Sequence, residues 1–318
     1  MEASATYRNL RAVLLAGGVG GARMARGLNA VLPPDNLTIV VNVGDDETMY
    51  GALVSADLDT VTYTLAGIVG PHGWGVHDDT HVVMDHLASM GADTTFRLGD
   101  RDLAHCLARR MALEAGETLS AFTAAATARL GIECRVLPAS DDPIRTKIKT
   151  TKGELLDFQD YFVVRGQSDV VVGLEFRGAE SARPAPGVLT AIAAADIVVV
   201  APSNPPLSIW PMLAMPELAA AVRHHRRVVA VSPLIGGKAV KGPLVAVLDG
   251  LGIESSTAGI LETYEGLLSH LVIDQADSPP SGLDSGGVEL VGADTLISDP
   301  AAAARLASRI LDFAPASE

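Results

Sequence analysis

Cysteine, aromatic residues and lysine are all scarce in this 318-residue sequence. Cys106 and Cys134 are the only two cysteines, and neither lies in a CxxC pair, so we expect neither a zinc site nor a disulfide framework. Aromatic residues make up 4% of the chain, so aliphatic side chains must fill the core. The formal net charge of −14 argues against a nucleic-acid partner, because phosphate backbones require a broad basic surface.

Long hydrophobic runs are also missing. Apolar runs such as 197–201 are far shorter than the roughly 20 residues that cross a bilayer as a helix. The amino-terminal segment has no basic stretch followed by an apolar one, so it does not have the pattern of a secretory signal. We therefore expect a soluble, cytoplasmic protein with no membrane partner.

Short apolar runs alternate with longer stretches of helical periodicity. These runs are apolar throughout, as expected for strands buried on both faces of a parallel sheet. The four clearest are Arg11–Ala16, Thr38–Val43, Ile197–Ala201 and Arg227–Val231. Helical stretches between them, beginning with Gly20–Leu32, predict an α/β fold with a Rossmann-like, doubly wound, mainly parallel sheet.

The middle of the chain is less regular. Three stretches are predicted to be helices: Asp79–Met90, Arg101–Ala115 and Leu119–Leu130. Residues 134–176 have the pattern of short strands with charged turns, including a hairpin. We therefore predict a single α/β domain over residues 1–318, with an inserted helical and hairpin cap at about 75–180. A Pro-, Ser- and Gly-rich loop at 277–287 precedes a last predicted helix at Pro300–Phe313.

A glycine-rich loop follows the first predicted strand. Gly17, Gly18, Gly20 and Gly21 would let the backbone approach a phosphate, and the next helix would supply N–H donors. The loop is not a Walker loop, because no Gly-Lys-Ser/Thr follows, and Arg23 stands where GxGxxG has its third glycine. We favour ligand contact over a tight turn that only packs the helix on the sheet.

Four aspartates follow the second predicted strand. Asp45 and Asp46 end it, and Asp57 and Asp59 come shortly afterwards. Clustered carboxylates suit an oxygen-ligated cation such as Mg²⁺, and one of them could instead act as a general base or hold a ribose hydroxyl. Asp57 or Asp59 could instead be the N-cap of the helical segment from Thr60, and we favour capping for one of the two. We predict that Asp45 belongs to the site.

A third loop, Pro202–Pro206, presents Ser203 and Asn204 between prolines, directly after a strand. Asn204 could read a base edge or bind a phosphate, and an ordinary Asx turn is the alternative.

A fourth loop places two of the chain's five lysines in a glycine-rich segment after a strand. Gly237, Lys238 and Lys241 have the composition of an anion site, in which each lysine acts as a point charge. A solvated surface turn is the less favoured alternative. Because ligands of open α/β sheets bind beyond the carboxyl ends of the strands, all four loops are predicted to meet around one pocket.

Nine strings of the sequence occur in the order typical of one family. They are LLAGGVGGAR, VVNVGDD, ADLDTVTYTLAG, LGDRDLA, LPASDDPIRTKI, FQDYFV, EFRGAE, APSNPP and SPLIGGKAVKGP. In these strings, from about residue 11 to about 275, the chain resembles the 2-phospho-L-lactate transferases, whose bacterial members are also called phosphoenolpyruvate transferases of coenzyme F-420 synthesis.

The resemblance implies a Rossmann-like core with a capping insertion, and a Mg²⁺-dependent transfer. The donor would be a three-carbon acid, lactyl or enolpyruvyl, joined through a diphosphate to guanosine. The acceptor would be the ribityl hydroxyl of the 5-deazaflavin Fo, and GMP would leave. The Lys-poor, Ala- and Arg-rich composition resembles actinobacterial members and favours the enolpyruvyl donor. A homodimer is expected from the family.

The resemblance also suggests a role for each candidate residue. Asp45 would be a Mg²⁺ ligand, with Asp46 and Asp57 as lesser candidates, and Asp59 would hold or deprotonate the Fo hydroxyl. The glycine loop would line the reacting end. The remaining contacts would be to the guanosine carrier from Ser203 and Asn204, to its phosphates from Gly237, Lys238 and Lys241, and to the deazaflavin from Arg97 and Asp100.

Two alternatives remain open at this level. The segment Leu98–Leu103 could simply be a turn with a helix cap and an ion pair. The whole chain could instead be a nucleotide-sugar or NAD-binding protein on the same scaffold, although a clean GxGxxG is missing and the LGDRDLA and FQDYFV strings are present.

Overall fold

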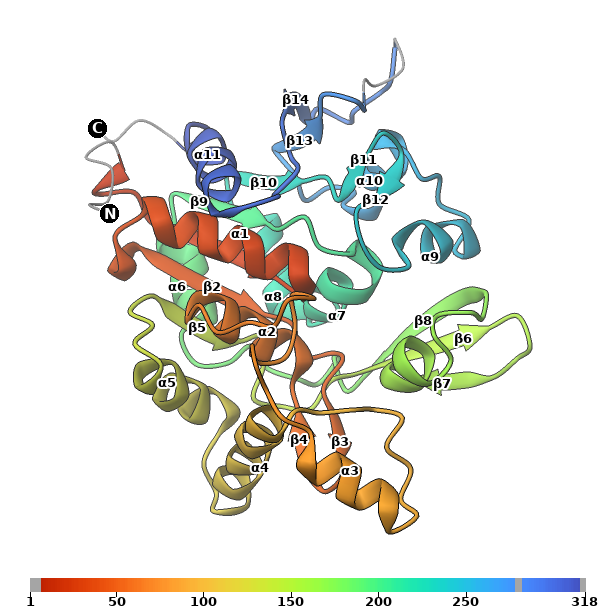
Figure 1. Cartoon of the computed structure of the whole chain (residues 1–318). Helices are drawn as coiled ribbons and strands as arrows, with labels where there is room; N and C mark the ends of the chain where they lie inside the picture. Colours follow the sequence, from red (N-terminus) through yellow and green to blue (C-terminus); the bar gives the residue numbers. More distant parts are fainter. Residues whose placement is uncertain (1–6, 278–281, 315–318) are drawn as a thin grey trace.

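The computed structural model describes residues 7–277 and 282–314. Seven parallel strands form the main sheet in the order β14-β13-β10-β9-β1-β2-β5 (Figure 1). Their bounds are Ala12–Ala16 for β1, Leu37–Val41 for β2, Arg135–Pro138 for β5, Ile197–Val200 for β9, Val228–Val231 for β10, His270–Asp274 for β13 and Glu289–Ala293 for β14. The chain first builds outward from β1 through β2 to β5, and then starts again on the other side of β1 with β9. This is the Rossmann-like order, with its switch point between β1 and β9.

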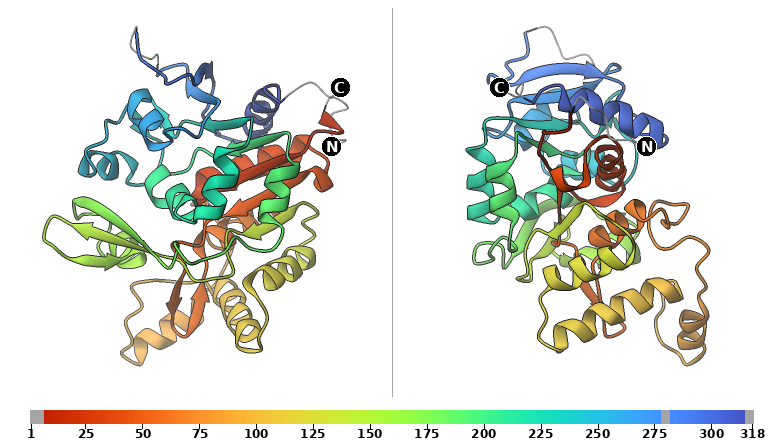
Figure 2. Two further views of the ribbon diagram at one scale, coloured as in Figure 1. Left: turned by 180° about the vertical axis from the view of Figure 1, so that it is seen from behind. Right: turned by 90° about the vertical axis from the view of Figure 1, so that its left-hand side faces the viewer.

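Helices cover both faces of this sheet, as Figure 2 shows in its right-hand view. On one face, α1 packs against α2 and α11, and on the other α6 packs against α8. The bounds are Gly18–Val31 for α1, Ala56–Leu65 for α2, Val188–Ala194 for α6, Trp210–Leu213 for α7, Pro216–Arg223 for α8, Leu244–Gly250 for α9, Thr257–Thr263 for α10 and Pro300–Leu311 for α11. All residues of β1, β9 and β10 are buried, which explains why they are apolar throughout.

Two groups of elements extend from the core (Figure 1). A hairpin of β3 and β4 and three helices lie below the sheet, and an antiparallel sheet in the order β7-β6-β8 projects to one side. The bounds are Glu47–Met49 for β3, Ala52–Val54 for β4, Val82–Ser89 for α3, Asp100–Glu114 for α4, Leu119–Arg129 for α5, Arg145–Thr150 for β6, Leu155–Asp157 for β7, Asp160–Val164 for the helical turn η3 and Val171–Arg177 for β8.

The predicted α/β fold class is confirmed, with some differences in detail. β5 returns to the main sheet inside the span of about 75–180, because Val136 and Leu137 join the buried core. α3 begins at Val82 rather than at Asp79, whose side chain instead caps α4. Part of the loop expected at 277–287 lies outside the described residues. No helix in 7–277 or 282–314 has the length and hydropathy to span a bilayer.

Candidate active site

The glycine turn after β1 is closely packed by neighbouring loops. A side chain on Gly17 would put its Cβ 2.5 Å from Asp57 Oδ2, and one on Gly20 would put its Cβ 2.1 Å from the carbonyl oxygen of Pro202. Gly18 has a φ of +61°, a backbone conformation that residues with a side chain rarely adopt. These glycines therefore let the start of α1 approach the loop that follows β9.

Ser203 fixes this approach across the switch point. Its buried hydroxyl donates to the carbonyl oxygen of Gly17 at 2.7 Å and lies 3.3 Å from the Gly17 nitrogen, from which it accepts. The neighbouring Asn204 accepts from the Leu207 N–H at 3.2 Å and so caps the helical turn η4 (Pro205–Ile209). The Asx-turn alternative thus describes Asn204, while Ser203 joins the two loops.

Replacing Gly20 with alanine should lower stability, because the Pro202 carbonyl belongs to the backbone and can move only with its loop. We expect a loss of about 1–3 kcal/mol in the free energy of unfolding, the usual cost of overpacking. Gly292→Ala in β14 is the matched control, because nothing lies within 4 Å of its added Cβ. Denaturant titration of both variants measures the difference, and equal midpoints would show that the contact is not tight.

Asn42, at the end of β2, brings two carboxylates together. Its amide nitrogen donates to Asp57 Oδ2 at 3.0 Å and lies 3.5 Å from Asp45 Oδ1. Its amide oxygen accepts from the Gly44 N–H at 2.9 Å, which fixes the orientation of the amide. The second oxygen of Asp57 accepts from the Gly18 N–H at 2.6 Å. The carboxylates of Asp45 and Asp57 therefore converge beside the glycine turn.

Three of the four buried aspartates that follow β2 have no cationic partner. Asp45, Asp46 and Asp57 are 4%, 3% and 6% exposed, and within the described part of the chain no Lys, Arg or His nitrogen lies within 4.0 Å of them. Burial raises the pKa of Asp46 to about 7 and that of Asp57 to about 6. Burial and the charge of Asp57 raise the pKa of Asp45 well above its usual range. Such uncompensated oxygen ligands fit a divalent cation.

Within this group, Asp46 faces a different neighbour. Its carboxylate accepts from the Ser55 hydroxyl at 2.6 Å, just before α2. The geometry therefore favours Asp45 and Asp57 over Asp46 as a pair of metal ligands.

Asp59 differs from the other three because α4 supplies it with positive charge. Arg109, 2% exposed, donates to both of its oxygens, with one nitrogen–oxygen distance of 3.1 Å, and His105 Nε2 lies 3.4 Å away. Burial acts to raise the pKa of Asp59, but the Arg109 guanidinium and His105 outweigh it and lower this pKa to about 2. A carboxylate with so low a pKa is a weak proton acceptor. Its pKa and its contacts with Arg109 and His105 favour a role for Asp59 as an anchor between α2 and α4. Its role as a base stays a prediction.

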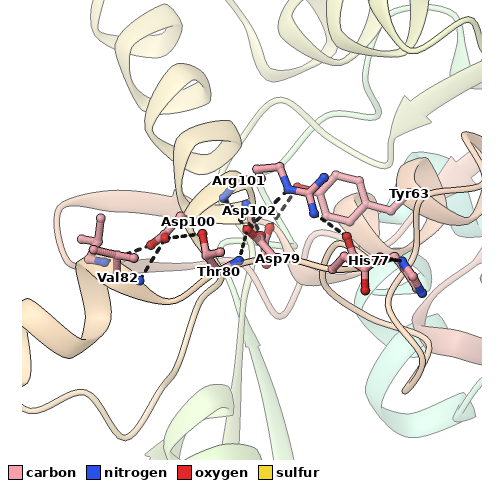
Figure 3. Close-up of polar contacts among 10 residues, drawn as sticks. Tyr63, His77, Asp79, Thr80, Val82, Asp100, Arg101 and Asp102 are labelled. Carbon is pink, nitrogen blue, oxygen red and sulfur yellow. Dashed lines mark hydrogen bonds and ion pairs between the residues drawn. The ribbon is translucent and has the colours of Figure 1, made fainter.

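The predicted pair Arg97 and Asp100 lies among the inserted helices (Figure 3 shows Asp100). Asp100 accepts from the Val82 and Val83 N–H groups at 2.9 and 3.0 Å and so caps α3. In return, Asp79 accepts from the Arg101 and Asp102 N–H groups and caps α4 (Figure 3).

Arg97 pairs with Asp85 at 2.5 Å on the surface. The helix-cap and ion-pair alternative therefore describes the contacts of both residues, Arg97 and Asp100.

The lysine loop is divided between two places. Gly237 and Lys238 belong to a small hairpin of β11 (Leu234–Ile235) and β12 (Lys238–Ala239), where Lys238 is exposed. The Gly237 N–H donates to Asp277 Oδ1 at 2.6 Å. Lys241 instead reaches across to the loop after α2, where it contacts Trp74. The structure thus brings together the glycine turn, Asp45, Asp57 and Ser203, and Lys241 contacts the loop that packs on this turn. Asn204 adjoins Ser203 as a helix cap, Lys238 is exposed on its hairpin, and Arg97 and Asp100 make their contacts among the inserted helices.

Several residues of the site had not been predicted. Asn42 stood inside one of the family strings but had no role, although it directly precedes the acidic turn. Gln159 donates to the carbonyl oxygen of Asp45 at 3.1 Å, and the Thr146 N–H donates to that of Gly44 at 2.7 Å. These contacts brace the acidic turn from β6, which carries Thr146, and from the segment after β7, which carries Gln159. Arg109 had no local signal, because its partner lies fifty residues earlier.

Comparison with solved structures places the chain in a fold class. A UPF0052 family protein from Bacillus halodurans aligns with a TM-score of 0.61 and 17% identity, covering 96% of this chain and 99% of that one. The molecule is therefore a Rossmann-like α/β protein.

The sequence comparisons give the family. The family model described as 2-phospho-L-lactate transferase CofD matches residues 12–303, so the chain belongs to this transferase family. A phosphoenolpyruvate transferase from Streptomyces griseus is 39% identical over 96% of this chain and 98% of its own length. A 2-phospho-L-lactate transferase from Methanosarcina acetivorans is 33% identical over 94% and 97%. The resemblance in the sequence strings is confirmed.

Proposed function

We propose that this chain transfers a phosphoenolpyruvyl or 2-phospholactyl group from a guanosine-diphosphate-linked donor to the ribityl hydroxyl of the 5-deazaflavin Fo, releasing GMP, in coenzyme F-420 biosynthesis. The observation that carries the proposal is the group of buried, unpaired carboxylates beside the glycine turn at the switch point. Actinobacterial relatives named phosphoenolpyruvate transferases, such as those from Streptomyces griseus and Thermobifida fusca, support the enolpyruvyl donor.

The proposed reaction is one displacement at phosphorus. The acceptor hydroxyl oxygen forms a bond to the phosphorus that bears the three-carbon acid. The bond from that phosphorus to the bridging oxygen breaks, GMP leaves with this oxygen, and the hydroxyl proton passes to solvent water. When bound, Mg²⁺ supplies positive charge against the diphosphate oxygens as the leaving group departs.

The chain's own residues would position this chemistry. Asp45 and Asp57 would hold Mg²⁺, and Asn42 would keep their carboxylates aligned. The glycine turn would place the N-terminal end of α1, with its positive dipole, near the diphosphate. Of the two roles predicted for Asp59, holding the acceptor hydroxyl fits its low pKa better than accepting a proton.

The proposal is tested by direct turnover. The protein is mixed with Fo, Mg²⁺ and either the lactyl or the enolpyruvyl donor, and mass spectrometry then looks for GMP and a heavier deazaflavin. We expect product with at least one donor, and faster turnover with the enolpyruvyl one. Folded protein that gives no product with either donor would contradict the proposal.

The raised pKa values of Asp46 and Asp57 predict a pH-dependent effect of Mg²⁺ on stability. Because folding raises these pKa values from 3.8 to about 7 and about 6, these two carboxyl groups stabilise the metal-free protein most at low pH. Their contribution is lost as the pH rises from about 4 to about 7. Mg²⁺ binds the ionised carboxylates, so it should raise the melting temperature much more at about pH 8 than at about pH 5. Thermal melts with and without Mg²⁺ measure this, and equal shifts at both pH values would contradict the assignment.

A further inference from the structure

A tryptophan and a lysine join the two halves of the main sheet near its ligand edge. Trp74 lies in the loop after α2, in the half built on β1 and β2. Lys241 lies between β12 and α9, in the half built on β9 and β10. The Lys241 Nζ stands 4.0 Å from the centroid of the Trp74 ring, and it also donates to the carbonyl oxygen of His72. The contact therefore connects the elements on either side of the switch point.

The loop that carries Trp74 rests on the glycine turn. The Gly70 N–H donates to the carbonyl oxygen of Gly75 at 2.9 Å, which closes the loop on itself. Gly73, with φ +89°, lies so close to Val19 in the first turn of α1 that an added Cβ would be 2.7 Å from its Cγ1. Trp74 is thereby held beside the turn where the donor's diphosphate is proposed to bind.

Lys241 lacks an anionic partner in this position. Its contacts are an indole ring and a carbonyl group, and in residues 7–277 and 282–314 no carboxylate lies within 4.0 Å of its ammonium group. Burial and the nearby charge of Arg23 lower the pKa of Lys241. Trp74 is 52% exposed, and cation–π contacts at exposed sites are weak compared with charge-assisted bonds to phosphate. A diphosphate arriving at the glycine turn would therefore compete well for this lysine.

We propose that Trp74 and Lys241 form a clasp that holds the lysine ready beside the glycine turn and releases it to the diphosphate of an incoming guanosine-diphosphate donor. The inference rests on the proposed function, because that function supplies the diphosphate. In this proposal Trp74 is a positioning residue, because Trp74 contacts Lys241 and only Lys241 contacts the donor. Closure of the contact marks the ligand-free protein, and opening marks the bound one.

The chain's two tryptophans make the clasp directly observable. Trp210 donates through its indole nitrogen to the carbonyl oxygen of Thr263, and a Trp210→Phe variant leaves Trp74 as the only indole reporter. GDP with Mg²⁺ should change the Trp74 emission in a saturable way. Pyrophosphate with Mg²⁺ should give the same change, and guanosine alone should not. The Trp74→Phe variant should show no such change.

Substitution of the lysine tests cause and effect. In Lys241→Met on the Trp210→Phe background, GDP should still bind, as measured by calorimetry, but at least about ten-fold more weakly and without the change in emission. Turnover of Lys241→Met and of Trp74→Ala should show a raised KM for the donor, larger in the first, with an unchanged KM for Fo. Lys241→Arg should restore most of the donor affinity.

The possible outcomes distinguish failure of the clasp from failure of the proposed transferase function. GDP binding that leaves Trp74 emission unchanged overturns the clasp while the proposed function stands. The same holds if Lys241→Met retains the full emission change, or if Trp74→Ala raises only the KM for Fo, which would make the ring an acceptor platform. Folded, unmodified protein that gives no product with either donor contradicts both, whereas turnover without any binding of GDP overturns only the clasp.

Discussion

Replacing Asp45 with asparagine should lower the turnover number by about 10³-fold, the loss expected when charge stabilisation is removed from a phosphoryl-transfer site. The substitution keeps the shape of the side chain and removes one of two converging carboxylates. It also removes a buried negative charge that the Asp57 carboxylate repels, so the free energy of unfolding of the metal-free protein should stay the same or rise. Loss of activity without loss of stability would identify a ligand rather than a structural residue.

Measurement of kcat over a range of Mg²⁺ concentrations, with thermal melts of the same samples, checks this expectation. The stabilisation by Mg²⁺ predicted above should disappear in Asp45→Asn. Asp35→Asn is the matched control, because Asp35 is exposed and lies on the short helical turn before β2. Turnover of Asp45→Asn near that of the control would remove Asp45 from the site.

Replacing Arg109 with methionine should cost about 3–5 kcal/mol of unfolding free energy. Both ends of the Arg109–Asp59 pair are buried, so loss of the guanidinium leaves the Asp59 carboxylate without its main counter-charge. It also removes the donor to the Leu53 carbonyl oxygen at 2.9 Å, which ties α4 to β4. The low pKa of Asp59 has the same origin, because the arginine favours the ionised form.

The neighbouring residue supplies a control that differs mainly in burial. Arg110 forms an exposed pair with Glu114 at 2.7 Å, and Arg110→Met should change stability by less than about 1 kcal/mol. The double variant Asp59→Asn/Arg109→Met should recover much of the stability lost in Arg109→Met, because the stranded charge is gone. Denaturant titration of the four proteins would contradict this account if Arg109→Met and Arg110→Met were alike.

The sequence predicted the centre of the fold better than its edges. β1, β2, β9 and β10 occupy central positions, and burial on both faces gives them the uninterrupted apolar runs that reveal strands. β14 lies at one edge and is only partly buried, so its ELVGA sequence carries no comparable signal. β5, at the other edge, was hidden among the short strands of the cap.

The same contrast holds for the site. Asp45 and the glycine turn directly follow buried strands. Because ligands of open α/β sheets bind beyond the carboxyl ends of the strands, this position was enough to predict that they lie together. Asp100 and Asn204 were also predicted to contact the substrates, and the structure shows both as caps that accept from backbone N–H groups, because short polar side chains serve equally well in that role. Their substrate contacts stay a prediction. Arg109 could not be found from the sequence, since only the packing of α4 on α2 brings it to Asp59.

The exchange of caps between α3 and α4 has a consequence for how the inserted helices can move. Asp100 closes the start of α3, and Asp79 closes the start of α4, so fraying at either helix exposes backbone donors of both. The starts of the two helices are consequently tied together, so we expect changes in the length or sequence of the loop that connects α3 to α4 to leave this contact in place.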